Sequence, residues 1–127
     1  MHFRWISLGL ALAWVGVITA QQAAPKPETV MVTLLAKPGS EAALAKVLDR
    51  HWETARKLNL VRESSHLAYS GSNAPGTTFF VEIFTWRDGN IPDHAPSEIQ
   101  AIWAEMNQLV EARAGTPGLR FVELTER

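Results

Sequence analysis

Two residues of this sequence could exchange a proton near neutral pH. Glu82 lies between Phe80 and Phe84, in a run that is dense in β-branched and aromatic residues. Burial raises the pKa of a carboxyl group, which makes it a general acid or base that works near neutrality. Ion pairing with a residue such as Arg120 would instead make Glu82 structural. His94 is the second candidate base, since an imidazole titrates near neutral pH, and its alternative is a solvated loop residue.

Aromatic residues accompany these two candidates. Trp86 ends the run that holds Phe84, and a tryptophan ring can stack on a flat aromatic molecule. His51 and Trp52 fall on the inner stripe of a predicted helix, and Trp103 falls on the inner stripe of another. Each could instead be an ordinary core side chain. We expect substrate contacts from Trp86, Trp103, Phe84, Trp52 and His51.

Several other kinds of site lack their residues. The chain has no cysteine, so it has no thiolate nucleophile, disulfide or cysteine-ligated metal. His51, His66 and His94 fall on three different predicted elements, without the spacing of a helical zinc motif, so we expect no metal site. The chain also lacks a Gly-x-Ser-x-Gly elbow, a phosphate-binding glycine loop and a dinucleotide fingerprint.

Four strands and two helices would have to position these residues. Residues 77–86 are the clearest strand, because β-branched and aromatic residues fill both faces. Apolar residues at helical spacing predict one helix from Ser40 to about Leu58 and a second from Ile99 to Arg113. The predicted strands are 29–36, 65–70, 77–86 and 119–125.

The resulting order is βαββαβ, which is typical of an α+β, ferredoxin-like domain. In this arrangement the first and third strands are central in a four-stranded antiparallel sheet, and both helices cover the same face. One helical layer can bury only one sheet face, yet both central strands are apolar on both faces. Such an exposed apolar face is typical of an interface, and two-fold pairing of identical chains is the commonest kind. We therefore expect a homodimer that pairs sheet against sheet.

The residues expected on the face without helices come from the two central strands. They are Met31, Leu35, Phe80, Phe84 and Trp86.

The start of the chain has the pattern of a secretory signal peptide. Arg4 precedes an apolar run, residues 5–17, and small residues lead up to Ala20. That run has 13 residues, fewer than the roughly twenty that span a membrane. We expect a signal peptide at 1–20, a linker at 21–28 and one folded domain at 29–127, in a periplasmic or secreted protein. An uncleaved N-terminal anchor is the alternative.

The charge of the chain excludes a class of partner. The sequence has 12 lysines and arginines against 13 aspartates and glutamates, and Arg4 is the only charged residue of the leader. The mature part would carry 11 basic against 13 acidic residues, a balance of −2. Without a basic surface, binding to nucleic acid is not expected.

One stretch resembles a known family. Residues 80–88 read FVEIFTWRD and are followed by His94 and by Ile102-Trp103. This pattern resembles the antibiotic biosynthesis monooxygenase-like family of dimeric α/β barrels, over nearly all of residues 29–125. Trp86 and His94 resemble a pair found in oxygenases of the family. The chain departs from them on the first strand, where they carry an asparagine that polarises the substrate and this chain offers Thr33.

The resemblance leaves two classes of function open. It implies a cofactor-independent monooxygenase that acts on a small hydrophobic or aromatic molecule, with His94 or Glu82 as base and Trp86 and Trp103 as walls. Heme handling, with His94 as axial ligand, is a variant of that reading. The alternative is a non-catalytic module of the same fold that binds a ligand or associates with other proteins. The fold alone does not decide between them.

Overall fold

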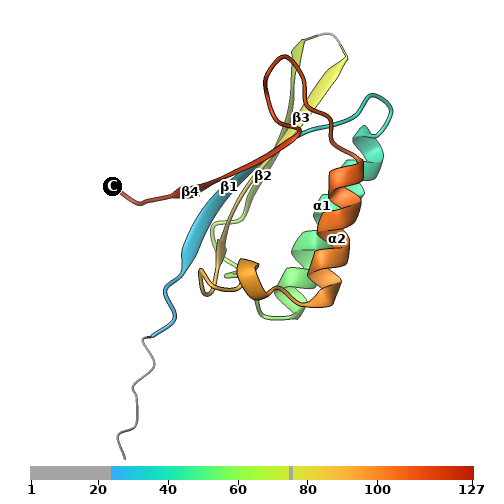
Figure 1. Ribbon diagram of the computed structural model, residues 1–127. Coiled ribbons are helices and arrows are strands. Elements are labelled where there is room, and N and C mark those ends of the chain that lie inside the picture. Colours follow the sequence, from blue (N-terminus) through green and yellow to red (C-terminus); the bar gives the residue numbers. More distant parts are fainter. Residues whose placement is uncertain (1–23, 75) are drawn as a thin grey trace, which may run out of the picture.

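The computed structural model describes residues 24–74 and 76–127 (Figure 1). The predicted signal peptide and the first part of the predicted linker lie outside the described residues. The elements run β1 (Glu28–Leu35), α1 (Glu41–Lys57), β2 (Leu67–Ala74), β3 (Thr77–Trp86), a 3-10 turn (Pro92–His94), α2 (Ser97–Gln108) and β4 (Leu119–Leu124). This order confirms the predicted α+β, ferredoxin-like class. Neither helix of the described part is long and apolar enough to cross a membrane.

The four strands form one antiparallel sheet in the order β2-β3-β1-β4. The central positions of β1 and β3 are those predicted. Figure 1 shows both helices packed side by side on one face of the sheet, while the other face carries no helix. The pocket described below lies between these two layers.

The end of β2 differs from its prediction. The strand continues to Ala74, beyond its predicted end at Ser70, because the added residues pair with the start of β3. Gly71 pairs with Phe79, and the phenylalanine ring lies over the glycine. A β-carbon at Gly71 would come within 2.6 Å of that ring. The pairing therefore depends on the missing side chain.

The end of α2 also differs. The helix stops at Gln108, not near Arg113, because the chain leaves it to pair with the end of β1. The amide of Lys37 donates to the carbonyl oxygen of Leu109, and the amide of Glu111 donates to that of Leu35. The backbone after the helix thus exchanges helical hydrogen bonds for bonds with the sheet.

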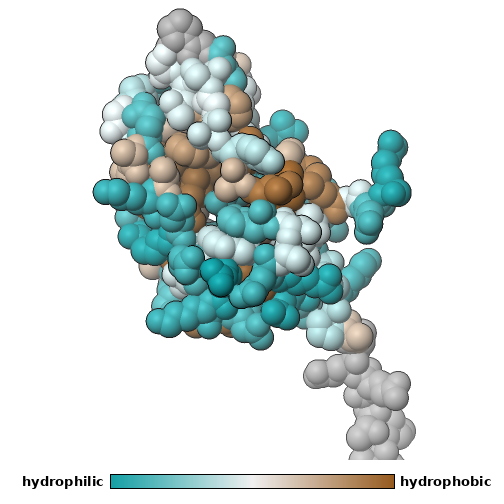
Figure 2. All heavy atoms as spheres, turned by 180° about the vertical axis from the view of Figure 1, so that it is seen from behind, coloured by the Kyte–Doolittle hydropathy of each residue, from teal (hydrophilic) through white to brown (hydrophobic). Residues whose placement is uncertain are grey.

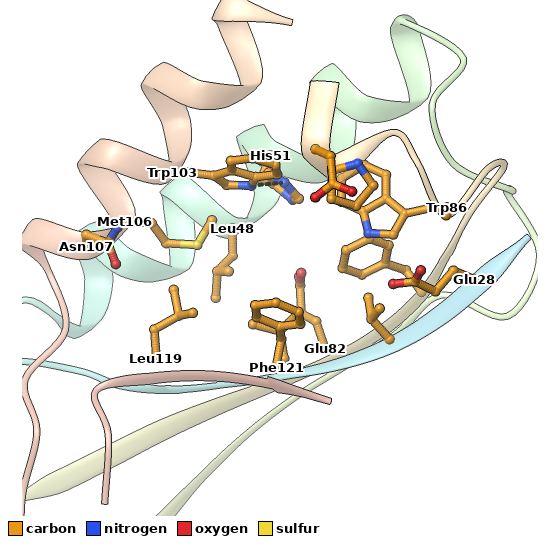
Figure 3. A pocket seen from close by; sticks show the side chains of 16 residues that line it. Glu28, Leu48, His51, Glu82, Trp86, Trp103, Met106, Asn107, Leu119 and Phe121 are labelled. Atoms are coloured by element: carbon orange, nitrogen blue, oxygen red, sulfur yellow. Dashed lines mark hydrogen bonds between the residues drawn. The ribbon is translucent and has the colours of Figure 1, made fainter. Parts of the chain in front are cut away.

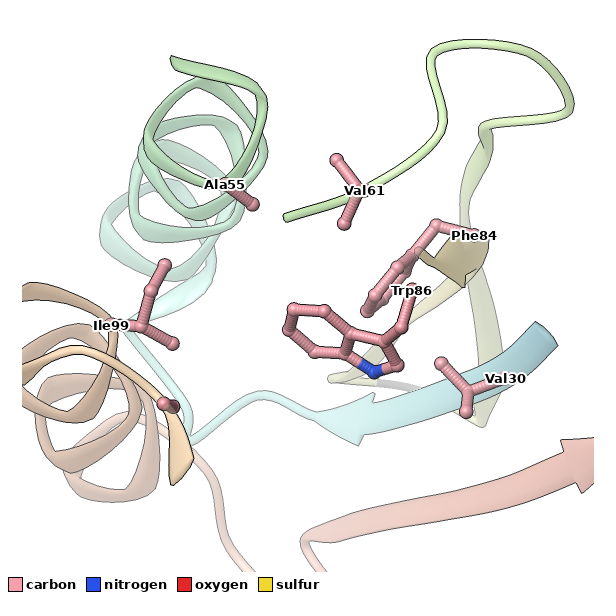
Figure 4. Close-up of a cluster of buried hydrophobic side chains, with 7 residues drawn as sticks. Val30, Ala55, Val61, Phe84, Trp86 and Ile99 are labelled. Atoms are coloured by element: carbon pink, nitrogen blue, oxygen red, sulfur yellow. The ribbon is translucent and has the colours of Figure 1, made fainter. Parts of the chain in front are cut away.

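Two clusters of buried side chains join the layers. In the first, Phe84 and Trp86 of β3 and Val30 of β1 pack beneath Ala55 of α1 and Ile99 of α2 (Figure 4). The second is centred on Leu34 of β1, Leu44, Val47 and Leu48 of α1, and Ile102 and Met106 of α2. Leu34, Leu44 and Ile99 are fully buried, so these positions fix how the helices sit on the sheet.

The register corrects the prediction for the open face. Val30 lies opposite Phe84 and Leu34 opposite Phe80, so the even-numbered residues of both strands face the helices. Phe80, Phe84 and Trp86 were therefore placed on the wrong face. Leu35 is buried as well. Of the five residues expected on the open face, only Met31 stays both on that face and partly exposed.

The open face is nevertheless apolar. Its apolar members, which alternate with the helix-facing residues, are Met31 of β1, Leu67 and Tyr69 of β2, Phe79, Val81 and Ile83 of β3, and Val122 and Leu124 of β4; Thr33 and Arg120 also lie on this face. Leu67 and Tyr69 are exposed. Figure 2 shows one side of the molecule, on which hydrophobic residues gather between hydrophilic ones.

Candidate functional site

A pocket of about 460 Å³ opens between the sheet and the two helices (Figure 3). Its walls are mostly apolar and come from β1, β3 and β4 on one side and from α1, α2 and the 3-10 turn on the other. The polar lining side chains are Glu28, His51, Glu82, Asp93, Trp103 and Asn107. A pocket of this size and character suits a small hydrophobic molecule.

Glu82 lies on the floor of the pocket and points from the sheet toward the helices (Figure 3). It is an even-numbered residue of β3, opposite Val32, so strand alternation places it under the helical layer. Only 4 % of the residue is exposed. Burial raises the pKa of its carboxyl group to about 7, and the charge of Asp49 acts in the same direction. Glu82 can therefore gain or lose a proton near neutral pH.

His66 faces this carboxyl group from just before β2. Its Nε2 lies 3.6 Å from Oε1 of Glu82, which is too long for a good hydrogen bond, and it is buried without a partner. The imidazole stacks on Trp52, with the ring centroids 3.7 Å apart and the planes 13° from parallel. Burial and the charge of Arg56 lower the pKa of His66, against a smaller opposing effect of Asp49. A neutral imidazole therefore stands beside Glu82 at neutral pH.

His51 and Trp103 form a second polar contact in the pocket. The indole Nε1 of Trp103 donates a hydrogen bond of 3.0 Å to Nε2 of His51 (Figure 3). Because an indole N–H can only donate, Nε2 carries no proton and the neutral ring keeps its hydrogen on Nδ1. Burial, with the charge of His66, lowers the pKa of His51 to about 4. His51 is therefore neutral at pH 7 and fixes the orientation of Trp103.

The aromatic wall is built from rings that meet edge to face. The Trp86 centroid lies 5.1 Å from that of Phe84, with the planes at 77°, and 6.3 Å from that of Trp103, with the planes at 88°. These are favourable aromatic geometries, and each helps to hold the next ring in place.

Five of the predicted site residues come together in this pocket. They are Glu82, Phe84, Trp86, His51 and Trp103.

Two predicted residues lie elsewhere. His94 is exposed and does not line the pocket, whereas its neighbours Pro92 and Asp93 do. A 3-10 turn has three residues per turn, so adjacent side chains point about 120° apart. The prediction that His94 is the base of this pocket is therefore not supported by its position. Trp52 lies outside the lining too, because its ring packs on His66 and on the first core cluster.

Sequence reasoning missed the residue that faces Glu82. Arg120 was considered for this role, but it pairs with Thr33 on the open face of the sheet and cannot reach the pocket. His66 was not among the predicted site residues. Strand alternation could have indicated that His66 faces Glu82. Ala68 lies opposite Glu82, and His66 precedes Ala68 by two residues, so the two share a face.

The polar residues at the pocket mouth were missed as well. Glu28 immediately precedes the strand predicted at 29–36, and Asp93 lies between the strand predicted at 77–86 and the second predicted helix. Nothing in their local sequence marks either as a pocket residue.

The pocket residues do not fit a metal or a heme. Within residues 24–74 and 76–127, no group of three histidine, aspartate or glutamate side chains could hold a metal ion. His94, the axial ligand in the heme variant, is exposed outside the pocket. The histidine that does line the pocket, His51, already uses Nε2 to accept the bond from Trp103.

Comparison with known proteins supports the fold. No family model and no curated protein matches the sequence. Among solved structures, an antibiotic biosynthesis monooxygenase matches with a TM-score of 0.60 and 17% identity, over 79% of this chain and 98% of its own. Rv0793 from Mycobacterium tuberculosis matches with a TM-score of 0.59 and 19% identity, over 80% and 96% of the two chains.

A third match is a mutant of SnoaB, a cofactor-independent oxygenase from Streptomyces nogalater. It has a TM-score of 0.57 and 15% identity, over 79% of this chain and 93% of its own. These matches confirm the predicted resemblance at the level of the fold. At such identities the likeness does not extend to activity.

Proposed function

We propose that the pocket binds a small phenolic aromatic molecule and that Glu82 removes a proton from it in a cofactor-independent oxidation. The observation that carries this proposal is the buried carboxyl group of Glu82, whose pKa is raised to about 7 and which faces an aromatic pocket. A base matched to neutral pH is what proton removal from a weakly acidic substrate requires. Structures with this fold include a cofactor-independent oxygenase, which adds support at the level of the fold.

The reaction can be balanced without a cofactor. Glu82 takes the hydroxyl proton, which leaves an electron-rich phenolate. Molecular oxygen adds to the ring carbon opposite the hydroxyl group, and the oxygen–oxygen bond then breaks. One oxygen atom stays on that carbon as a carbonyl, and the other leaves as water with the hydroxyl proton and the hydrogen of the ring carbon. The phenol becomes a quinone, and all the electrons that reduce oxygen come from the substrate.

His66 would serve Glu82 as the next proton acceptor. Its Nε2 is turned to the carboxyl group and has no other partner, whereas 20% of the side chain is exposed. A proton can pass from Glu82 to the buried nitrogen while the opposite edge of the ring exchanges with water. Trp52, which stacks on the ring, holds it in this position.

Oxygen uptake with 1-naphthol, a hydroxynaphthalene whose ring carbon opposite the hydroxyl group bears a hydrogen, tests the proposal. The wild-type protein should consume oxygen and form the quinone, and Glu82→Gln should lower the rate by about a hundredfold, the lower range for loss of a general base. Binding, followed by quenching of tryptophan fluorescence, should change little in this variant. Glu98→Gln removes an exposed carboxyl group of α2 and is the matched control. Equal rates for Glu82→Gln and the wild type would refute the role of Glu82.

The second proposed function is a non-catalytic ligand-binding module. The observation that favours it is the exposure of His94, which leaves the pocket without the histidine that the family resemblance implies. Ligand-dependent quenching without oxygen uptake, for every phenol tried, would establish this function in place of the first.

We also propose that the protein is an exported homodimer. Its apolar open face would be covered by the sheet of a second copy, as an exposed patch of this kind requires. Native mass spectrometry of protein exported with its own leader reports both properties. A dimer of chains that begin at Gln21 is expected. A monomer would refute the homodimer, and an intact leader would refute cleavage of the signal peptide at 1–20.

A further inference from the structure

The charged side chains that line the pocket are all of one sign. They are the carboxyl groups of Glu28, Glu82 and Asp93, and neither lysine nor arginine is among the lining residues. His51 adds no positive charge, because its lowered pKa keeps the ring neutral. The pocket therefore presents a negative potential to any ligand, and the apolar walls strengthen it by excluding water.

Two of these carboxyl groups lie at one end of the pocket. The Glu28 carboxylate lies against Gly89, and Figure 3 shows it on the same side as Trp86. Asp93 follows four residues after Gly89 in the same segment and also lines the pocket. An indole ring thus stands beside acidic side chains, as in sites that bind organic cations through both charge and the face of an aromatic ring.

Glu82 supplies an independent observation. It is 96% buried and points into the cavity, and no hydrogen bond reaches its carboxyl group from any residue that the structure describes. Nε2 of His66 lies 3.6 Å from Oε1, too far for a good hydrogen bond. A buried polar group without a donor is costly, so a ligand that donates a hydrogen bond here would be favoured.

We propose that the ligand of this pocket is an aromatic amine in its protonated form, with a hydroxyl group directed to Glu82 and the ammonium group held by Glu28, Asp93 and the face of Trp86. The inference rests on the proposed function in taking Glu82 as the group that meets the hydroxyl.

A positive charge on the ligand would favour the proposed reaction. Removal of the hydroxyl proton neutralises Glu82 and creates a phenolate, which the carboxylates of Glu28 and Asp93 oppose by Coulomb repulsion. An ammonium group on the same molecule offsets that repulsion, because it places a positive charge between the phenolate and the acidic end of the pocket. An anionic aromatic acid would meet the same repulsion with nothing to offset it, so the pocket should reject it.

Three probes with one ring system separate charge from shape. They are 2-naphthylmethylamine, 2-naphthalenemethanol and 2-naphthoic acid, which are cationic, neutral and anionic at pH 7. Affinities come from quenching of tryptophan fluorescence in the full chain. The amine should bind about tenfold more tightly than the alcohol, the range of one cation–aromatic contact with partial charge pairing, and the acid should bind most weakly.

Variants then assign the preference to its residues. Glu28→Gln combined with Asp93→Asn should make the amine and the alcohol bind alike, whereas Glu98→Gln should leave the tenfold difference in place. Equal or tighter binding of the alcohol to the wild type, or tight binding of the acid, overturns the inference. If the alcohol binds and a hydroxynaphthalene is oxidised, the proposed function survives that result. If no probe binds, this inference falls, and if a hydroxynaphthalene is not oxidised either, the proposed function falls with it.

Discussion

The replacement Glu82→Gln should change how the stability of the protein depends on pH. The folded protein holds the Glu82 proton with a pKa of about 7, against an ordinary value of 4.5. A raised pKa means that the folded state binds the proton more tightly than the unfolded state does. The stability that this proton contributes is fully present below about pH 4.5, and it is lost as the pH rises through about 7.

The magnitude follows from the separation of the two pKa values. One pKa unit corresponds to about 1.4 kcal/mol, so the wild type should lose about 3 kcal/mol of unfolding free energy through this group between pH 4.5 and 8. Glutamine has almost the same shape and cannot ionise, so the variant lacks this loss. Its stability relative to the wild type should rise by about 3 kcal/mol over that interval.

Urea unfolding of both proteins across the pH range measures this difference. Reading only its change with pH removes the fixed effect of the substitution on packing. His51 and His66 titrate in both proteins, so their contributions cancel to first order. The protein concentration must stay constant, because association would stabilise the folded state by mass action. Glu98→Gln is the control for the loss of one carboxyl group.

A difference that stays flat from pH 4.5 to 8.5 would refute the reasoning. It would mean that the Glu82 carboxyl group ionises in the folded protein as easily as in the unfolded chain. The group could then not serve as a base tuned to neutral pH, and the proposed reaction would lose its central residue. A difference that falls with pH would show that the ionised form is the stabilised one, which is the opposite sign.

Three further predictions concern the surroundings of the pocket. The hydrogen bond from Trp103 to Nε2 of His51 favours the neutral imidazole by about 1 kcal/mol. Trp103→Phe removes this donor, so the pKa of His51 should rise from about 4 by less than one unit. An unchanged titration of the His51 ring by NMR would refute this. Leu44→Ala should lower the unfolding free energy by about 2 to 5 kcal/mol in urea, because Leu44 is fully buried; a loss below 1 kcal/mol would contradict the packing. Val81→Lys should turn the proposed dimer into a monomer in native mass spectrometry, and a retained dimer would place the interface elsewhere.

Local sequence was sufficient where local chemistry decides the structure. The run of β-branched and aromatic residues in β3 predicts a strand from Thr77 to Trp86, and the structure has the same bounds. The order of elements followed from such local patterns. The end of β2 did not, because Gly71 enters the strand only through its pairing with Phe79, a contact made by another strand.

The relation between the two central strands could not be predicted from local pattern. Alternation divides each strand into two faces, but it does not say which face of β1 lies beside which face of β3. The pairing of Val30 with Phe84 decides this, and it sends Phe84, Trp86 and Glu82 together beneath the helices. Glu82 was predicted as a buried base and Phe84 as a wall, while the open-face argument placed Phe84 on the opposite surface. Only the register resolves that conflict.

The pocket and the proposed dimer interface lie on opposite faces of one sheet. Glu82 faces the helices, whereas its neighbours Val81 and Ile83 face the open side, so a single residue step along β3 separates the two sites. The helical layer that buries Trp86 also desolvates Glu82, and it does so within one chain. The raised pKa of Glu82 therefore does not require the second copy. Pairing of two sheets would stabilise the floor of the pocket from below, and the chemistry above it would remain the property of each protomer.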